Sequence, residues 1–136
     1  MPSTLNVKFS FNHTYLDPRL LLHGGATFNQ ADSKAKSQPD LFVFDVETLI
    51  WKKFFVFDQP SARDQHSLTK IGSQYFLYGG HVSPDNSVLD ELWMLNLDSV
   101  AWTSKTLELP GIVWEKIETF ESIGGLYGHR AVAHPN

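Results

Sequence analysis

The chain has 136 residues, 42% apolar and 19% charged, which indicates a folded domain with a sizeable core rather than a disordered segment. Its net charge of −4 gives no basic footprint for a nucleic-acid backbone, and its lack of cysteine excludes disulfides and thiolate chemistry. The N-terminus shows no apolar signal segment, and no apolar run is long enough to cross a membrane. We therefore expect a cytoplasmic protein with no nucleic-acid and no membrane partner.

Short apolar runs separated by turns follow one another along the chain. The run "RLLLHGG" closes on two glycines at Gly25, and "DLFVFDV" is followed by a turn at Glu47-Thr48 and by "LIWKKFFVF". The series then begins again, because "HSLTKI" and "QYFLYGG" flank Gly72-Ser73, which is a hairpin signal. No window shows a convincing helical period. Each unit therefore predicts short antiparallel strands.

The two units also match in spacing. Leu41 and Leu92 lie 51 positions apart, and so do Trp51 and Trp102. Four strands in a unit of about 50 residues is the period of a β-propeller blade.

Several of these features together resemble the kelch-repeat family. A kelch repeat has an apolar strand that ends in Gly-Gly, then a variable loop, then a strand with an aromatic residue about seven positions before a tryptophan. The chain carries this pattern twice, at Gly24, Gly25, Phe44 and Trp51 and again at Gly79, Gly80, Leu95 and Trp102. The family usually has tyrosine where this chain has Phe44 and Leu95. The resemblance covers nearly the whole chain and implies an all-β fold, a fragment of a kelch-type β-propeller built of four-stranded antiparallel blades.

We expect the following division of the chain. One blade covers residues 12–62, a second covers 65–120 with an insert near 107–125, and the first strand of a further blade covers 127–136. A propeller closes with about four to eight blades, so we expect this one to be completed by further sequence or by another chain. Exposed strand edges and blade faces would otherwise make the isolated chain oligomeric or poorly soluble.

Two tryptophans compete to begin the outer strand of the second blade. Trp102 keeps the spacing from the preceding strand, and it is the alternative that we favour. Trp114 lies 15 positions before His129, as Trp51 does before His66, and its register makes Pro110-Gly111 a hairpin tip.

Glycines and tryptophans have structural roles in this interpretation. Glycine reaches positive φ without a steric clash and lets another backbone come close, so both Gly-Gly pairs are expected at the crowded inner part of a blade. The tryptophans are expected to fill the widening space between blades, which predicts a buried Trp51.

The histidines and the known propeller chemistries favour no enzyme. His13, His66 and His129 recur at one phase of the repeat, as structural residues do, and we expect no metal, no cofactor and no catalytic residue. Propellers resembling galactose oxidase need a cysteine-linked tyrosine, which this chain cannot form, and the Glu-x-x-x-Asp-x-x-x-His iron pattern of nitrile-specifier proteins is absent from the sequence.

Recognition of other proteins is the remaining function. Kelch propellers usually bind protein partners through loops on one face, and the loops of this chain differ greatly in length. The candidate partner-binding residues are Arg63, His81, Asp85 and Asn86. Two alternatives stay open: a structural subunit of a large permanent assembly, or a fragment of a kelch-type propeller enzyme such as a sugar mutarotase.

Overall fold

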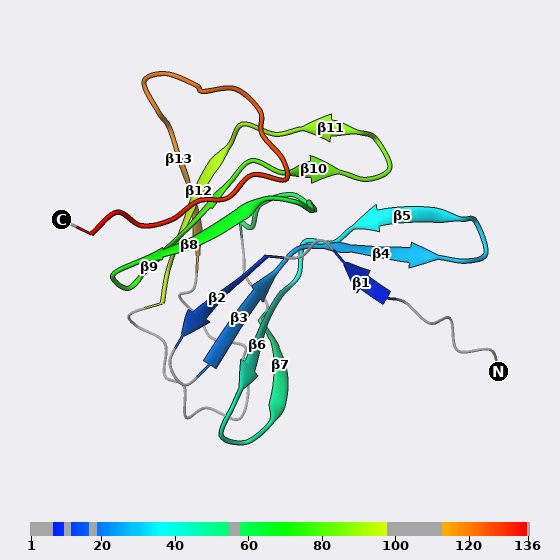
Figure 1. The fold of residues 1–136 in the computed structure, drawn as a ribbon, viewed down its shortest axis with the longest axis horizontal. Coiled ribbons are helices and arrows are strands. Elements are labelled where there is room, and N and C mark those ends of the chain that lie inside the picture. Colours follow the sequence, from blue (N-terminus) through cyan, green and yellow to red (C-terminus); the bar gives the residue numbers. More distant parts are fainter. Residues whose placement is uncertain (1–6, 10–11, 17–18, 55–57, 98–112, 136) are drawn as a thin grey trace.

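The computed structural model describes residues 7–9, 12–16, 19–54, 58–97 and 113–135, with side chains in the last three ranges. Every regular element within these ranges is a β-strand (Figure 1). The strands form two four-stranded antiparallel sheets, one three-stranded sheet and one two-stranded hairpin. The expected all-β fold class is confirmed.

The two large sheets follow one another in the chain. Sheet 1 has the order β2-β3-β6-β7, formed by β2 (Asn12–Leu16), β3 (Arg19–His23), β6 (Leu41–Asp45) and β7 (Ile50–Phe54). Sheet 2 has the order β8-β9-β12-β13, formed by β8 (Ser67–Ile71), β9 (Gln74–Tyr78), β12 (Leu92–Asn96) and β13 (Trp114–Ile117).

A hairpin is inserted after the second strand of each large sheet, and β1 (Val7–Phe9), which precedes sheet 1 in the chain, adds a third strand to the first hairpin. This three-stranded sheet has the order β1-β4-β5, with β4 (Ala26–Asn29) and β5 (Lys34–Ser37). The second hairpin consists of β10 (His81–Val82) and β11 (Ser87–Val88).

The predicted turns form because their residues satisfy local backbone groups. Between β6 and β7, the Asp45 carboxylate accepts hydrogen bonds from the amides of Glu47 at 2.9 Å and Thr48 at 3.1 Å. Gly72, between β8 and β9, has φ of 61°, a conformation that side chains disfavour. Both hairpins that the sequence predicts are thereby confirmed.

The core lies between the two large sheets. Successive side chains of a strand point to opposite faces, so each sheet presents an alternating set of residues to the other. Sheet 1 contributes Leu21, Leu41, Val43 and Phe54, and sheet 2 contributes Leu68, Tyr75, Leu77, Leu95 and Trp114, all with 6% exposure or less. One face of each sheet is therefore buried against the other sheet.

The outer strand of sheet 2 begins at Trp114, so our preference for Trp102 is wrong. Trp114 pairs with Leu95 just as Trp51 pairs with Phe44. Trp102 lies outside the described residues. Equal spacing from the preceding strand was misleading because the extra residues lie between β12 and β13, before the tryptophan rather than after it.

The expectation that Trp51 is buried is also wrong. Its side chain is 53% exposed and packs against Phe44 at a ring distance of 4.8 Å, whereas Trp114 is 2% exposed. The two tryptophans are equivalent in the repeat, but sheet 1 covers Trp114 and nothing described covers Trp51 in the same way. Burial here depends on a neighbouring sheet and not on the residue alone.

Both Gly-Gly pairs meet the backbone of the segment that begins the next unit. Gly24 has φ of 69°, and a Cβ atom on it would lie 2.6 Å from the carbonyl oxygen of Arg63 and 2.5 Å from Cε1 of the His66 ring. Gly79 has φ of 68°, and a Cβ atom there would lie 2.5 Å from the carbonyl oxygen of Leu126. No larger residue fits at either position, as expected from the sequence.

His66 is buried beside His23, with Nε2 of His66 3.1 Å from Nδ1 of His23. Burial, with the nearby Arg63 charge, lowers the pKa of His66 to about 3. His13 does not share this position, although the sequence suggested it. His13 pairs with Leu22 as Leu68 pairs with Leu77, so the strand register aligns His13 with Leu68 and not with His66.

Residues 127–135 do not form the expected first strand of a further blade. They are described as irregular backbone that lies beside β8, where the hydroxyl of Thr69 donates to the carbonyl of Ala131 at 3.2 Å. A strand requires a paired neighbour, and no described segment pairs with this one along its length. The domain boundaries of the blades themselves stay a prediction.

Replacing Trp114 by alanine should lower the free energy of unfolding by about 3–5 kcal/mol, because truncating a buried aromatic residue leaves a cavity. The matched change Trp51→Ala should cost about 1 kcal/mol or less, because its ring lies on an open sheet face. Urea unfolding at a protein concentration low enough to avoid association measures both losses. Equal losses would contradict the difference in burial.

Acidification should destabilise the fold through His66. Its folded pKa of about 3 lies below the usual histidine value of 6.5, so between these values the unfolded chain binds a proton that the folded chain does not. Stability should therefore fall as the pH drops below 6.5, by about 2 kcal/mol at pH 5 from this group. Urea unfolding at pH 7.5 and pH 5 should show a smaller difference for His66→Gln than for the original chain. An unchanged difference would mean that His66 is not the buried neutral group described.

Candidate functional site

Two hairpins project from the same side of the molecule, each directly after a Gly-Gly pair (Figure 1). The β4–β5 hairpin is closed by the side chains of Asn29 and Asp32, which accept hydrogen bonds from the amides of Ala31 and Lys34. The β10–β11 hairpin is closed by Asn86, whose φ is 60° and whose amide donates to the carbonyl of Val82 at 2.8 Å. The residues of both turns are those that favour tight turns.

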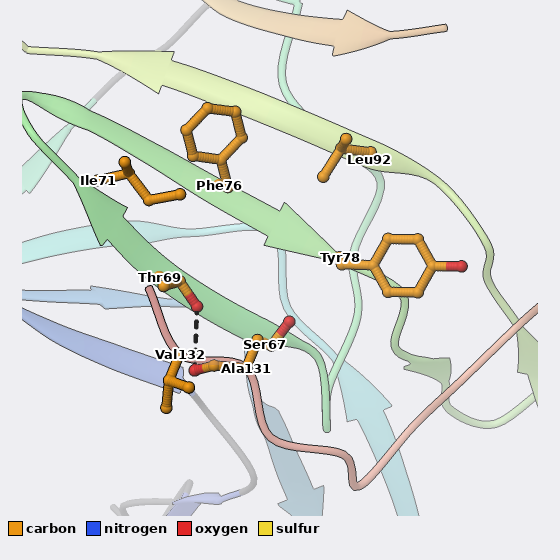
Figure 2. Close-up of a pocket in the computed structure, with 8 residues that line it drawn as sticks. All are labelled: Ser67, Thr69, Ile71, Phe76, Tyr78, Leu92, Ala131 and Val132. Carbon is orange, nitrogen blue, oxygen red and sulfur yellow. Dashed lines mark hydrogen bonds between the residues drawn. The ribbon is translucent and has the colours of Figure 1, made fainter. Parts of the chain in front are cut away.

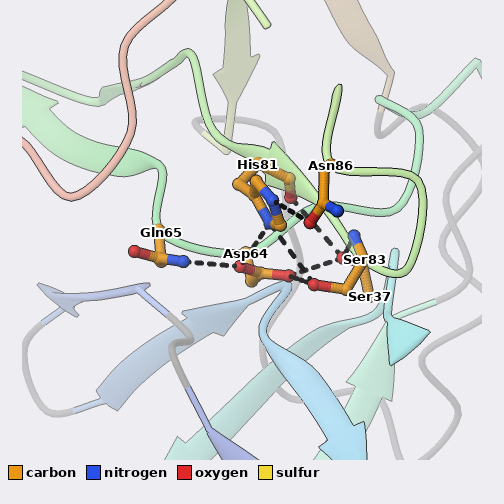
Figure 3. Close-up of polar contacts among 6 residues, drawn as sticks. All are labelled: Ser37, Asp64, Gln65, His81, Ser83 and Asn86. Atoms are coloured by element: carbon orange, nitrogen blue, oxygen red, sulfur yellow. Dashed lines mark hydrogen bonds and ion pairs between the residues drawn. The ribbon is translucent and has the colours of Figure 1, made fainter. Parts of the chain in front are cut away.

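A buried carboxylate joins the two hairpins (Figure 3). Asp64 is 2% exposed and accepts hydrogen bonds from the hydroxyl of Ser37 at 2.6 Å and the hydroxyl of Ser83 at 3.1 Å. Ser37 ends β5 and Ser83 follows β10, so one carboxylate holds an element from each hairpin. Hydrogen bonds to an ionised group are stronger than neutral ones. The Asp64 carboxylate therefore fixes the hairpins relative to each other.

Backbone contacts reinforce this junction. The amide of Asp64 donates to the carbonyl of His81, and the amide of His81 donates to the carbonyl of Asp64, both at 2.8 Å. The amide of Ser83 donates to the hydroxyl of Ser37 at 2.7 Å, and the amide of Ser37 donates to the carbonyl of Ser83 at 3.1 Å. The two hairpins are thus held by main chain as well as by side chains.

His81 connects the buried carboxylate to the protein surface. Its Nδ1 lies 3.5 Å from a carboxylate oxygen of Asp64 and 3.3 Å from the hydroxyl of Ser83, while its Nε2 lies 3.1 Å from the side-chain oxygen of Asn86. The ring also lies 5.4 Å from that of Tyr127. Asn86 is exposed, so the network runs from the interior to a hairpin tip.

The group contains serine, histidine and aspartate but lacks the arrangement of a hydrolase triad. In a triad the serine and the carboxylate bind opposite nitrogens of the imidazole, so that a proton can move between them. Here Ser83 and Asp64 both lie at Nδ1 of His81. This geometry positions the hairpins and does not activate a nucleophile.

Arg63 belongs to the interior, which corrects its assignment as a partner-binding residue. It is 0% exposed, and its guanidinium donates to the carbonyl of Gly79 at 3.0 Å and to the carboxylate of Glu91 at 2.7 Å. Its remaining bonds are to Ser61. A side chain engaged in this way cannot reach a partner, because its donors are bound within the chain.

The pKa values around Arg63 follow from this burial. Burial lowers the pKa of the Arg63 guanidinium, and the interaction with Glu91 opposes that shift. Burial alone would raise the pKa of Glu91, but hydrogen bonds from Arg63 and from the indole of Trp93 hold it below its usual value. The pair therefore stays ionised and links the segment before β8 to the segment before β12.

The other three candidate residues lie on one hairpin. His81 is half-buried, and Asp85 and Asn86 are exposed in the turn between β10 and β11. Sequence reasoning missed the roles of Ser37, Asp64 and Ser83 in joining the hairpins. Ser37 and Asp64 are 27 positions apart, and no local spacing reveals such a contact.

We define the hairpin surface as a set of six exposed side chains on these two hairpins. Its members are Phe28, Lys34, Lys36, Asp85, Asn86 and Val88. The surface combines apolar and charged groups, and Phe28 is 40% exposed. Within the described part of the chain, no three histidine, aspartate or glutamate side chains are grouped so that they could hold a metal ion. The described residues also include no helix long and apolar enough to span a membrane.

Comparison with known proteins supports the repeat. No family model matches the chain. Kelch domain-containing protein 10 from Homo sapiens is 26% identical over 121 residues, which cover 85% of this chain and 26% of that protein. The protein of the same name from Rattus norvegicus is 26% identical over 121 residues, with 28% of its length covered.

A fungal protein matches a shorter stretch. Tip elongation aberrant protein 3 from Schizosaccharomyces pombe is 33% identical over 61 residues, which cover 44% of this chain and 5% of that protein. The chain spans about a quarter of the length of the kelch domain-containing relatives and much less of the fungal one. The repeated Gly-Gly contacts, the two four-stranded sheets and the similarity to these relatives support a kelch-type fold for this chain.

Proposed function

We propose that this chain is a non-enzymatic interaction module that binds a protein partner through the hairpin surface. The observation that carries the proposal is the junction at Asp64, where Ser37 of one hairpin and Ser83 of the other bind the same carboxylate. Projecting loops are normally mobile, and ordering them on binding weakens affinity. Hairpins that are fixed in advance avoid that loss.

The composition of the hairpin surface fits a protein partner. Exposed Phe28 and Val88 supply apolar contact area, and Lys34, Lys36 and Asp85 supply charges of both signs. Protein interfaces combine an apolar centre with a polar rim in this manner. The net charge of −4 gives no support to a nucleic-acid partner.

The cleft on sheet 2 offers little support for catalysis (Figure 2). It has a volume of about 260 Å³, and its hydroxyl groups come from Ser67, Thr69 and Tyr78. Each of these hydroxyls already has a partner within the chain: Nε2 of His129 at 2.9 Å, the carbonyl of Ala131 at 3.2 Å and the carbonyl of Gly124 at 2.6 Å, respectively. The remaining lining is apolar, which suits packing better than chemistry.

Changing the hairpin surface should abolish partner binding without unfolding the chain. The tagged chain would be used to capture proteins from an extract of its source, and the captured proteins would be quantified for Phe28→Ala and Asp85→Ala. A side chain central to an interface contributes enough that its loss weakens binding about tenfold or more. Lys70→Ala, an exposed change in β8 of sheet 2, is the matched control and should retain capture. Capture that survives both hairpin changes would refute the proposed surface.

Loss of the Ser37 hydroxyl should release the second hairpin from the first. Ser37→Ala removes the hydroxyl that donates to the Asp64 carboxylate and accepts from the amide of Ser83. Its loss should lower the free energy of unfolding by about 1–3 kcal/mol. Amide hydrogen exchange should become faster at residues 81–88, which lie far from Ser37 in the sequence. Ser87→Ala, an exposed serine in β11, is the control and should leave exchange unchanged. Equal exchange in both variants would show that the junction does not hold the hairpins.

A further inference from the structure

A loop that follows β13 runs beside the β10–β11 hairpin (Figure 1). It consists of residues 118–126, and we call it the Phe120 loop. A Cβ atom at Gly125 would lie 2.9 Å from Cγ1 of Val88, and the amide of Leu126 donates to the carbonyl of Leu89 at 3.3 Å. The loop therefore adjoins the hairpin surface, of which Val88 is a member.

Hydrogen bonds hold the Phe120 loop in place. The hydroxyl of Ser122 donates to the carboxylate of Asp90 and accepts from the amide of Gly124, both at 3.0 Å. The carbonyl of Gly124 accepts from the hydroxyl of Tyr78 at 2.6 Å. A segment that is already held in this way loses little conformational entropy when it binds a partner.

The Phe120 loop presents apolar side chains to water. Phe120 is fully exposed and Ile123 is 76% exposed. Tyr127, just after the loop, is exposed as well, and its ring lies 5.4 Å from that of His81. Single exposed apolar residues are common on proteins, but several on one ordered segment indicate a surface for interaction.

The charges around these apolar side chains are negative. Residues 81–91 and 117–128 contain no lysine or arginine, and their exposed acidic residues are Asp85, Asp90, Glu118 and Glu121. Phe120 lies between Glu118 and Glu121 in the sequence. Lys116, directly before this stretch, lies 3.5 Å from Glu91 and is engaged by it.

This combination selects among the classes of partner. Carboxylates repel the phosphates of nucleic acids and of anionic lipids. They attract lysine and arginine, and an arginine guanidinium also stacks favourably on an aromatic ring such as that of Phe120. A protein segment that carries cationic side chains next to apolar ones therefore matches the loop in both respects.

We propose that the Phe120 loop binds a protein segment in which lysine or arginine side chains lie next to apolar ones. The apolar side chains of that segment cover Phe120 and Ile123, while its cations pair with Glu118 and Glu121. The inference rests on the proposed function, because the loop extends the hairpin surface, and it adds the chemistry of the partner.

Charge on the other hairpin fixes the orientation of this partner. The β4–β5 hairpin carries the exposed cations Lys34 and Lys36. Like charges placed opposite each other disfavour a complex, so the basic part of the partner faces the Phe120 loop and not the β4–β5 hairpin.

A random-peptide display library, selected on the immobilised 136-residue chain at low salt, provides the probe. The enriched peptides should contain an excess of lysine and arginine together with apolar residues. One of them would be synthesised, and its affinity for the chain in solution would be measured by fluorescence anisotropy. The affinity should fall as salt is added, because salt screens the exposed charges.

Substitutions in the loop test where this peptide binds. Phe120→Ala and Glu121→Lys should each weaken binding about tenfold or more. Both side chains are exposed, so the fold should tolerate the changes, which circular dichroism verifies. Leu49→Ala and Glu47→Lys make matched changes at exposed positions between β6 and β7 and should retain binding.

Phe28→Ala separates this inference from the proposed function. It alters the hairpin surface away from the Phe120 loop and should leave binding of the basic peptide intact. Peptides that depend on Phe28 and not on Phe120 would overturn the inference and leave the hairpin surface standing. A selection that enriches no peptide, or peptides without excess lysine and arginine, would overturn it too. So would Phe120-dependent binding to phosphatidylcholine vesicles in place of basic peptides, because the loop would then recognise lipid.

Discussion

The close approach of a glycine pair to the next segment of the chain determines the rest of this structure. A Cβ atom at Gly24 would lie 2.6 Å from the carbonyl oxygen of Arg63, and that carbonyl accepts a hydrogen bond from the amide of Gly25 at 3.0 Å. The amide of Gly80 makes the equivalent bond with the carbonyl of Leu126 at 2.8 Å. Because only glycine permits such contact, each pair fixes where the next unit begins.

The same contact places the hairpin surface. Gly25 and Gly80 are followed directly by β4 and β10, so each hairpin leaves the sheet where the neighbouring segment is held. That segment supplies Asp64 to the hairpins on one side and the Arg63 guanidinium to Glu91 on the other. Two adjacent residues thus serve different purposes: Asp64 orders the hairpin surface, and Arg63 stabilises the interior.

The sequence was sufficient for the elements that depend on local chemistry. Gly-Gly pairs, hairpin turns at Glu47-Thr48 and Gly72-Ser73, and the all-β fold class follow from nearby residues. Features that depend on a distant neighbour were not predictable: Trp51 and Trp114 look alike in sequence, but only one has a sheet against it. Arg63 looked like a surface cation because its buried partner Glu91 lies 28 positions away. The junction at Asp64 was missed for the same reason, because Ser37 lies 27 positions away in the sequence.

Nuclear Overhauser contacts measure most directly whether the glycine pairs pack against histidines. We expect contacts from the Hα protons of Gly24 to the ring of His66, and from those of Gly79 to the ring of His129, since both rings lie within 3.2 Å of where a Cβ would be. The His66 ring should also stay neutral well below pH 6.5, because burial lowers its pKa to about 3. Absence of both contacts, with a His66 ring that titrates as it does in an unfolded chain, would show that the glycine pairs do not pack against buried histidines.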